Sequence, residues 1–310
     1  MKIGFIGLGA MGGPMAMRVV RAGFQQVCVG GHGAADALAS LGAALVATPA
    51  EVARQADVVI TMLPADAELK EVVLGVNGLR EGFSPGKTLI DMTTATGMSL
   101  LEVERELAPL GVRVLDAPVS GGTPAAAEGK LTIMVGGDAD LLEQHRPLLE
   151  TMGTKIVHVG ALGQGKVVKM VNQMMAAVHL LAIGEAFALG ARCGADATTM
   201  YNVIRDSSGY SRMMDLRLPG FLLAGSSRPG FKLDLMKKDL NLALESARST
   251  GIPVLLTSLA TQIFSAASTA GEGGSDFSAA AQFLAAMAKV DLNQTSVTET
   301  SSQSSRVTTS

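Results

Sequence analysis

Two polar side chains, Lys169 and Asn172, lie three residues apart in an otherwise apolar stretch. In a helix they would share one face. A lysine that points inward loses hydration, so burial lowers its pKa toward the range that is useful for proton transfer. Asn172 could then hold the amine or a substrate oxygen without adding charge. The spacing alone leaves a second interpretation open, in which Lys169 extends to the surface, as we expect of Lys166.

A glycine pattern of the form G-x-G-x-x-G follows the first apolar run of the chain. Its first glycine allows a tight turn, its second lets the backbone approach a pyrophosphate, and its third lets helix and strand pack closely. The N-terminus of the following helix attracts phosphates. A glycine-rich turn without a ligand is the alternative. The context predicts dinucleotide binding by a loop that consists of Gly7, Leu8, Gly9, Ala10, Met11 and Gly12.

The end of the second predicted strand bears on the choice of cofactor. An Asp or Glu there would bind the ribose hydroxyl of NAD, but residues 28–33 read CVGGHG, with neither a carboxylate nor an arginine. The missing carboxylate removes a repulsion against the 2′-phosphate of NADP. His32 could donate to that phosphate, although a solvated loop histidine is the simpler interpretation. We predict NADP or NAD as cofactor, with NADP tolerated at Gly30, Gly31 and His32.

Two further segments combine polar groups with small or apolar neighbours. Residues 116–124 (DAPVSGGTP) end a predicted strand in a small-residue loop. Such a loop could direct a hydroxyl and several backbone N–H groups at an anion, for example a substrate carboxylate, although a structural turn has the same composition. Residues 231–240 (FKLDLMKKDL) place a Lys-Asp pair on a predicted helix, where a solvated run of charges is usual.

The elements that must position these residues change in kind along the chain. The first half alternates apolar runs with helix-spaced stretches, and strands are predicted at residues 2–6, 27–29, 58–62, 88–91, 113–116, 132–135 and 156–159. This alternation predicts an α/β fold with a Rossmann-type domain over residues 1–162, whose parallel sheet is covered on both faces.

Residues 163–291 are predicted to form an all-α domain for substrate binding and dimerisation. Its helices are expected at residues 166–192, 198–206, 212–223, 233–249 and 256–270. The first of these is apolar nearly all round, so we expect it to be buried in a bundle or at a subunit interface. Residues 292–310 are mostly Ser and Thr with almost no apolar residues, and this tail is expected to be disordered.

The composition excludes several classes of partner. A net charge of −3 provides no excess of positive charge for binding nucleic acid or an anionic membrane surface, and an aromatic content of 4% provides few rings on which bases could stack. The most apolar stretch, residues 170–192, is interrupted by polar side chains, so no transmembrane span is predicted. The two cysteines, Cys28 and Cys193, are too few for a disulfide framework and indicate reduced thiols in a cytoplasmic protein. No metal site is predicted.

Six motifs in order give the chain a resemblance to the β-hydroxyacid dehydrogenase family, which includes 3-hydroxyisobutyrate dehydrogenase and 2-hydroxy-3-oxopropionate reductase. They are GxGxMG at 7–12, MLP at 62–64, DMTT at 91–94, DAPVSGG at 116–122, GxGxxxKxxN at 163–172 and FxLxLxxKD at 231–239. The resemblance spans residues 1–290. The chain departs from the family pattern at Gly30 and Gly31, where members often carry Asp or Asn-Arg, and this departure concerns cofactor preference rather than fold.

The resemblance implies a role for each matched motif. Lys169 would be the catalytic acid and base, and Asn172 its partner at the substrate. The substrate carboxylate would lie against Ser120, Gly121 and Gly122, and residues 207–212, with Ser211 among them, align with a pocket-lining stretch. The nicotinamide and its ribose would lie against Leu63, Pro64 and Thr94, while Lys238, with Phe231 nearby, would close over the cofactor from the second domain. A homodimer or homotetramer is expected, as is typical of the family.

Together these features predict an NAD(P)-dependent dehydrogenase that interconverts a small 3-hydroxy carboxylic acid and its semialdehyde. Four alternatives stay open at this point: an imine reductase-like enzyme, a dehydrogenase for dicarboxylic substrates of the 2-(hydroxymethyl)glutarate type, a decarboxylase similar to 6-phosphogluconate dehydrogenase, and a non-enzymatic cofactor-binding scaffold. In the dicarboxylic case Arg212 could pair with the second carboxylate, although an exposed arginine at a helix start is the simpler interpretation.

Overall fold

The computed structural model describes residues 1–224 and 229–292, and its contacts divide the chain into two compact units. The first unit consists of Met1–Met174 together with Lys238–Val254, and the second of the described residues within Met175–Lys237 and from Leu255 to Leu292. The helix that begins at the predicted boundary near residue 163 therefore contributes its first turns to the first unit. The tail expected to be disordered lies, from residue 293, outside the described residues.

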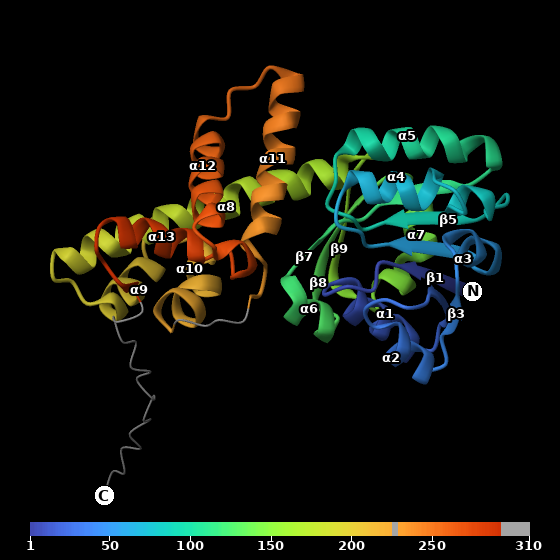
Figure 1. Ribbon diagram of the computed structural model, residues 1–310, viewed down its shortest axis with the longest axis horizontal. Helices are drawn as coiled ribbons and strands as arrows, with labels where there is room; N and C mark the ends of the chain where they lie inside the picture. Colours follow the sequence, from blue (N-terminus) through green and yellow to red (C-terminus); the bar gives the residue numbers. More distant parts are fainter. Residues whose placement is uncertain (225–228, 293–310) are drawn as a thin grey trace, which may run out of the picture. The chain divides into compact units, whose positions relative to one another are not determined.

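A mixed β-sheet forms the centre of the first unit (Figure 1). Its strand order is β3-β2-β1-β4-β5-β6-β8-β7, and β9 pairs with β8. Most strands are buried because they are short apolar runs packed on both faces. The strands are β1 (Lys2–Ile6), β2 (Gln25–Val29), β3 (Ala44–Val46), β4 (Val58–Thr61), β5 (Thr88–Asp91), β6 (Arg113–Asp116), β7 (Val119–Ser120), β8 (Leu131–Gly136) and β9 (Gly153–Gly160).

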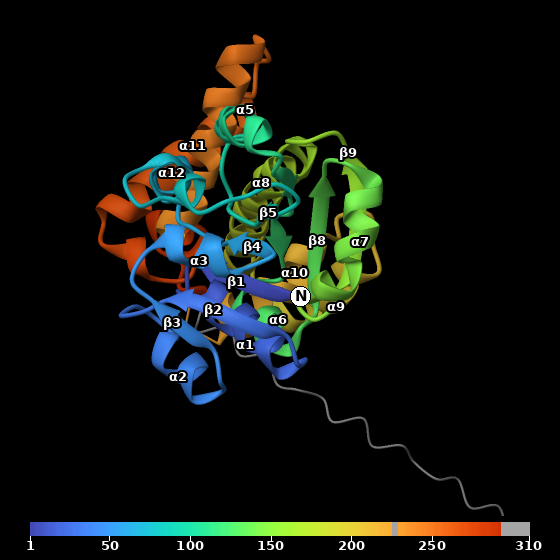
Figure 2. The same cartoon turned by 90° about the vertical axis from the view of Figure 1, so that its right-hand side faces the viewer.

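Helices cover both faces of this sheet, because alternate strand residues point to opposite sides. Val58 and Ile60 belong to one core cluster, with α1, α2, α6 and α7, and Val59 between them belongs to the other, with α3, α4 and α5 (Figure 2). The helices are α1 (Gly12–Arg21), α2 (Ala35–Ser40), α3 (Pro49–Gln55), α4 (Asp66–Leu74), η1 (Leu79–Glu81), α5 (Gly97–Leu107), η2 (Ala108–Leu110), α6 (Gly122–Glu128) and α7 (Ala139–Leu149).

The sheet differs from the predicted one in two respects. It is not wholly parallel, since β8 runs antiparallel to β6 and to β7. The strands β3 and β7 were also not predicted, because three and two residues are too few to show an alternating pattern. The loop predicted at residues 116–124 consequently contains β7 and the start of α6.

The second unit is helical, as expected. It holds most of α8 (Gln164–Arg192), the start of α11 (Leu233–Thr250), and α9 (Ala197–Arg205), α10 (Arg212–Arg217), η3 (Leu218–Leu223), α12 (Leu255–Thr269), η4 (Glu272–Gly274) and α13 (Ala279–Met287). The single helix predicted over residues 212–223 is divided into α10 and the π-helical η3, whose second residue is Pro219. A proline lacks the N–H that a continuous α-helix needs. The short helix α13 was not predicted.

The helix α8 is buried on one side only. Ala177 and Leu180 are fully buried, whereas Val171, Met175 and Leu189 expose 45%, 54% and 67% of their surface. A bundle within one subunit therefore does not bury the whole helix, and the alternative, burial at a subunit interface, stays a prediction. By length and composition α8 is also the described helix that could cross a membrane, but a long core helix has the same properties.

The buried histidine of α7 gives the first unit a predicted sensitivity to acid. His145 is 2% exposed, its Nε2 lies 3.1 Å from Thr88 Oγ1, and its Nδ1 has no hydrogen-bond partner. Burial, and then the positive charge of Arg113, lower its pKa below the ordinary value of 6.5. The unfolded chain therefore takes up a proton before the folded one as the pH falls, so stability decreases below pH 6.5.

The replacement His145→Gln should keep a hydrogen bond to Thr88 and remove this titration. Urea unfolding of both proteins between pH 7 and pH 5 measures the effect, and the free energy of unfolding should fall more steeply for the wild type. The exposed His32→Gln is the matched control and should follow the wild type. Parallel pH dependences for wild type and His145→Gln would contradict the prediction.

Candidate active site

The loop between β1 and α1 has two glycines that the fold itself requires. A Cβ on Gly12 would lie 1.8 Å from the carbonyl oxygen of Gly7, and Gly7 itself adopts a φ of 96°. Gly9 differs, because a Cβ there would meet no atom within 4 Å. No side chain caps the N-terminus of α1. Among its first three residues, Gly13 N–H already donates to the carbonyl oxygen of Gly9 at 2.9 Å and Pro14 has no N–H, so the N–H of Gly12 is the one that remains for an anion. The loop therefore fits the pyrophosphate of a dinucleotide, and Gly9 leaves room for it.

Leu8, Gly9 and Ala10 line an open cavity of about 570 Å³ that continues along α1. The same cavity reaches the arginines Arg18 and Arg21. Gly30, Gly31 and His32 follow β2 on a turn of which Gly31 and His32 are exposed. They do not line this cavity, so the predicted contact of these three residues with an adenosine ribose stays a prediction.

The turns after β4 and β5 are tied together by side chains. The N–H of Leu63 donates to Thr93 Oγ1 at 3.0 Å. Lys238 Nζ donates to the carbonyl oxygens of Pro64 and Thr94, at 2.8 and 2.9 Å. The structure thus brings Leu63, Pro64, Thr94 and Lys238 together, and their contact with a cofactor stays a prediction. Lys238 belongs to the first unit, however, and not to the second as expected.

Lys169 lies on α8 with its amine inside the first unit. The residue is 7% exposed, and its Nζ donates to Gln173 Oε1 at 3.0 Å. The Nδ2 of Asn172 donates to the same oxygen at 3.1 Å. Gln173 Nε2 in turn donates to Asp239 Oδ2 at 2.8 Å, and Asp239 Oδ1 lies 3.1 Å from Lys238 Nζ. A continuous polar network therefore connects Lys169 to the turns that carry Pro64 and Thr94.

The electrostatic surroundings of Lys169 favour loss of its proton. Burial lowers the pKa of Lys169 from 10.5 to about 8, the carboxylate of Asp239 opposes this decrease, and the charge of Lys238 adds to it. Because an amide separates the amine from the carboxylate, the ammonium form is only partly compensated. The interpretation in which Lys169 extends to the surface is therefore wrong, and the site holds an amine that can exchange its proton near neutral pH.

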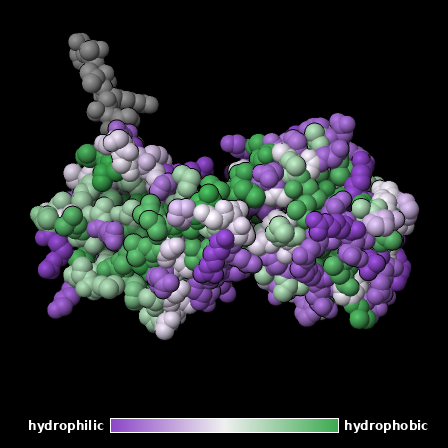
Figure 3. Space-filling model, turned by 90° about the horizontal axis from the view of Figure 1, so that it is seen from above, coloured by the Kyte–Doolittle hydropathy of each residue, from purple (hydrophilic) through white to green (hydrophobic). Residues whose placement is uncertain are grey.

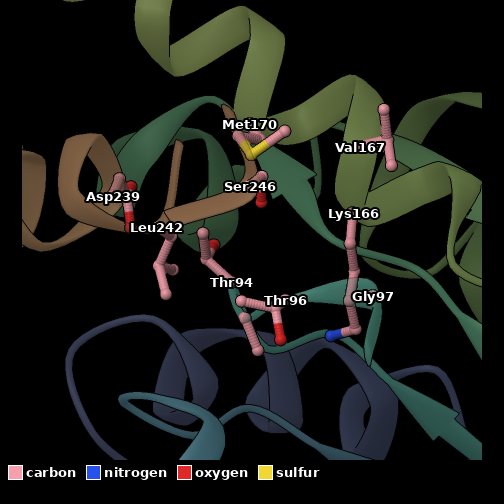
Figure 4. Close-up of a pocket in the computed structure, with 10 residues that line it drawn as sticks. Thr94, Thr96, Gly97, Lys166, Val167, Met170, Asp239, Leu242 and Ser246 are labelled. Carbon is pink, nitrogen blue, oxygen red and sulfur yellow. The ribbon is translucent and has the colours of Figure 1, made fainter. Parts of the chain in front are cut away.

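Lys166, expected at the surface, is also buried. It is 2% exposed, and its Nζ donates to Asp91 Oδ2 at 2.5 Å and to the carbonyl oxygen of Thr93 at 2.8 Å. Figure 4 shows it extending from α8 toward the turn that carries Thr96 and Gly97. A cavity of about 30 Å³, room for one water molecule, lies beside it. Lys166 is thus neutralised by direct contact with a carboxylate, whereas Lys169 is not.

The predicted carboxylate-binding segment begins in β7. Ser120 is half-buried and pairs with Thr132 of β8. Gly121 and Gly122 have φ angles of 139° and 69°, which side chains rarely adopt, so glycine is required at both positions. Among the described residues no hydrogen bond joins Ser120 to Lys169. The structure places these three residues at the start of α6, and their contact with a substrate stays a prediction.

Ser211, Arg212 and Phe231 belong to the second unit. Ser211 Oγ is buried and has no hydrogen-bond partner among the described residues, and Arg212 is the exposed first residue of α10. The ring of Phe231 packs edge-on against Phe277 with centroids 6.0 Å apart, and its N–H donates to Asp276 at 3.1 Å. The helix-start position predicted for Arg212 is confirmed.

Sequence reasoning missed Gln173 and Asp239 as partners of Lys169. Gln173 follows Asn172 and lies four residues beyond Lys169, so helical spacing alone could have found it. Asp239 was interpreted as part of a solvated charge run, yet it is 2% exposed. Asp239 lies three residues after the buried Met236 and one before the buried Leu240, so it lies on the buried face of α11. This spacing is the feature of the sequence from which its burial could have been predicted.

Comparison with known proteins agrees with this geometry. The family described as the NAD binding domain of 6-phosphogluconate dehydrogenase matches residues 2–160. The family described as NAD-binding of NADP-dependent 3-hydroxyisobutyrate dehydrogenase matches residues 163–305. The two matches together cover nearly the whole chain.

Individual relatives are similar over most of their length. The chain is 38% identical to 2-(hydroxymethyl)glutarate dehydrogenase of Eubacterium barkeri over 285 residues, which cover 90% of this chain and 93% of the relative. It is 37% identical to 2-hydroxy-3-oxopropionate reductase of Escherichia coli over 288 residues, or 93% and 98% of the two chains.

One solved structure that the chain resembles is 3-hydroxyisobutyrate dehydrogenase of Mycobacterium tuberculosis, which was solved with L-serine. Its sequence is 35% identical, the TM-score is 0.83, and the match covers 91% of this chain and 98% of that one. Imine reductases of Myxococcus stipitatus and Streptomyces aurantiacus, at 19% and 22% identity, share the fold alone. The site of Lys169, the glycine loop and these matches lead to one conclusion: the chain belongs to the β-hydroxyacid dehydrogenase family.

Proposed function

We propose that this protein is an NAD(P)-dependent dehydrogenase that interconverts a small 3-hydroxy carboxylic acid and the corresponding semialdehyde. The observation that carries the proposal is the buried amine of Lys169, whose pKa is about 8 and which, within residues 1–224 and 229–292, has an amide oxygen rather than a carboxylate as its hydrogen-bond partner. The relatives that are named for 3-hydroxyisobutyrate, 2-hydroxy-3-oxopropionate and 2-(hydroxymethyl)glutarate all carry a hydroxyl or carbonyl group near a carboxylate. L-Serine, found with the mycobacterial relative, is itself a 3-hydroxy acid.

Lys169 moves the proton of the reaction. In the oxidation its neutral amine accepts the hydroxyl proton of the substrate, and in the reduction its ammonium form returns that proton to the carbonyl oxygen. Asn172 and Gln173 hold the amine at a fixed place on α8, through hydrogen bonds of 3.1 and 3.0 Å that meet at Gln173 Oε1. Fixed placement of a reacting group lowers the barrier because less orientational freedom is lost in the transition state.

The residues that would hold the other reactants come from the same unit. Ser120, Gly121 and Gly122 bind the substrate carboxylate. The glycine loop and the N-terminus of α1 hold the cofactor pyrophosphate, and Leu63, Pro64 and Thr94 line the nicotinamide end. A bound nicotinamide supplies the hydride donor or acceptor that no protein side chain can provide.

For the cofactor we propose that NADP is accepted alongside NAD. A Cβ on Gly30 would make only ordinary contacts, the nearest at 3.7 Å to Leu45, and its φ is not in the left-handed region. The fold would therefore tolerate a carboxylate at this position, and its absence leaves no repulsion against a 2′-phosphate. His32, exposed on the same turn, is the available donor to that phosphate.

We further propose that the enzyme is a cytoplasmic homodimer or homotetramer. Both cysteines are unpaired, in agreement with a reducing compartment. Exposed apolar side chains gather on the second unit, among them Met175, Leu189, Leu255, Leu256 and Leu259, and Figure 3 shows hydrophobic surface over the helices of this unit. Exposed apolar area of this kind is typical of surfaces that a second subunit covers.

A dicarboxylic substrate is the second candidate, favoured by the 38% identity to 2-(hydroxymethyl)glutarate dehydrogenase. The test of the first candidate is a set of initial rates with short monocarboxylic aldehyde acids, each measured with NADH and with NADPH. Tartronate, methylmalonate and succinic semialdehydes and glyoxylate make up the panel. We expect turnover of at least one three- or four-carbon member with both cofactors. Absence of turnover across the panel, with NADPH bound, would contradict the proposed substrate class.

Replacement of Lys169 tests the proposed chemistry. Lys169→Met removes the proton carrier and should reduce kcat by about 10²- to 10⁴-fold. Because the replacement also removes a buried charge, the free energy of unfolding should not decrease at pH 7. In the wild type the rate of oxidation should rise with pH through about 8, as the amine becomes neutral, and the rate of reduction should fall over the same range. A wild-type rate in Lys169→Met would contradict the assignment.

Replacement of Gly9 separates ligand binding from folding. Gly9→Ala meets no protein atom within 4 Å, and an alanine restricts the unfolded chain, so stability should stay unchanged or rise by up to about 1 kcal/mol. The new methyl group should, however, occupy the space that the pyrophosphate needs and weaken NADPH binding by at least about tenfold. Fluorescence titration with NADPH and thermal unfolding measure the two effects. Unchanged affinity would show that Gly9 does not face the cofactor.

A further inference from the structure

The first turn of α8 is capped by a side chain from a distant strand. Asp116, the last residue of β6, accepts hydrogen bonds from the N–H of Gly163 at 2.7 Å and from the N–H of Lys166 at 2.8 Å. These donors belong to the helix N-terminus, where the backbone N–H groups have no partner within the helix. The carboxylate is fully buried, so the cap is a fixed contact rather than a solvated one.

The backbone around Asp116 is built to approach this carboxylate closely. A Cβ on Gly136 would lie 2.3 Å from Asp116 Oδ1, and a Cβ on Gly165 would lie 2.6 Å from Oδ2. Only glycine leaves room at both positions. Burial raises the pKa of Asp116, and the N–H groups of Gly163 and Lys166 oppose that rise, followed by the charge of Lys166. The helix N-terminus thus supplies part of the positive potential that an ionised Asp116 requires.

A second carboxylate holds the same turn through its side chain. Asp91, the last residue of β5, is fully buried and contacts Lys166 Nζ at 2.5 Å. Its other oxygen accepts hydrogen bonds from Thr61 Oγ1 at 2.7 Å and from the N–H of Thr93 at 3.2 Å. Asp91 and Asp116 are register partners on neighbouring strands. The two carboxylates therefore fasten one helical turn to the carboxyl ends of two adjacent strands.

Lys169 lies one helical turn beyond this attachment. A separation of three residues corresponds to about 4.5 Å along the axis. Because Lys169 is so close to the first turn, a displacement of that turn displaces the amine by nearly the same distance. The same attachment includes the carbonyl oxygen of Thr93, which precedes Thr94 in the turn expected to line the nicotinamide. The distance between Lys169 and that turn thus depends on Asp91, Asp116 and Lys166.

We propose that Asp91, Asp116 and Lys166 are positioning residues that hold Lys169 in register with the turn after β5. We assign none of them the reaction proton, since their hydrogen bonds within the described residues are with one another, with Thr61 and with the backbone of residues 93, 163 and 166. This inference rests on the proposed role of Lys169 in proton transfer. Misplacement of a reacting group by about 1 Å costs up to about 10²-fold in rate, so the effect belongs to kcat rather than to cofactor binding.

The experiment compares Lys166→Met and Asp116→Asn with the wild type and with Lys130→Met, an exposed lysine paired with Glu128 on the surface. We expect kcat to fall by about 10- to 100-fold in both variants, with the KM for NADPH within about twofold and near-wild-type circular dichroism. Lys130→Met should behave as the wild type. Unchanged kcat and unchanged pH profile in natively folded Lys166→Met and Asp116→Asn would overturn the inference.

A second readout does not depend on turnover. The pH dependence of acylation of Lys169 by an amine-reactive anhydride, followed by mass spectrometry, reports its titration midpoint. We expect that midpoint to shift in Lys166→Met, because the amine moves relative to Asp239, and to stay at the wild-type value in Lys130→Met. A wild-type midpoint in the folded Lys166→Met would also overturn the inference.

A neutral pair covers the case in which a single variant does not fold. The double variant Asp91→Asn, Lys166→Gln removes both charges and keeps a hydrogen bond between the two side chains, so it should fold and recover part of the lost kcat. A folded double variant whose kcat stays as low as that of Lys166→Met would count against positioning, because the restored contact would then have no effect on the rate. Lys169→Met separates the two proposals: if it retains turnover, the proposed function fails, and if it is inactive while the positioning variants keep wild-type kcat, only the positioning inference fails.

Discussion

The buried ion pair between Lys166 and Asp91 is the interaction on which the arrangement of the site depends. Removing either partner would leave an uncompensated charge in a fully buried position, which is far more costly than breaking a surface pair. Asp116 holds the backbone of the same residue, so that Lys166 is bound by one carboxylate through its N–H and by another through its side chain. Helix α8, the turn after β5 and the end of β6 are thereby fixed to one another, and the position of Lys169 follows from them.

Two lysines on one helix, three residues apart, consequently have opposite electrostatic roles. Lys166 meets the carboxylate of Asp91 directly and holds α8 to the end of β5. Lys169 meets an amide oxygen, with the carboxylate of Asp239 beyond it, and burial lowers its pKa to about 8. Residue type and burial are the same in both cases. What distinguishes a structural lysine from one suited to proton transfer is whether a carboxylate or an amide is the direct partner.

The sequence predicts those features whose cause is local. The glycine loop after β1, the strands that bury both faces, and the long helices follow from turn sterics and hydrophobic period. The strands β3 and β7 and the antiparallel direction of β8 could not be predicted, because two- and three-residue strands carry no period and strand direction depends on pairing far along the chain. Burial of Lys166 and Asp239 escaped prediction for a related reason. The partner of Lys166 is Asp91, 75 residues away. The partners of Asp239 are the amide of Gln173, 66 residues away, and the neighbouring Lys238, and only the fold brings the distant partners into contact.

The carboxyl edge of the sheet brings the cofactor loop, the turns joined by Lys238 and the attachment of α8 into one region. Parallel strands end at the same edge, where ligands of open α/β sheets bind. In this chain that edge supplies the glycine loop after β1, the turns after β4 and β5 that Lys238 joins, and the two aspartates that cap and anchor α8. A helix N-terminus needs negative partners, and the strand ends provide them in register. The edge of the sheet that orients the helix carrying Lys169 is therefore also the edge at which we propose that the cofactor binds. A change in strand pairing would consequently alter both the position of Lys169 and the cofactor site.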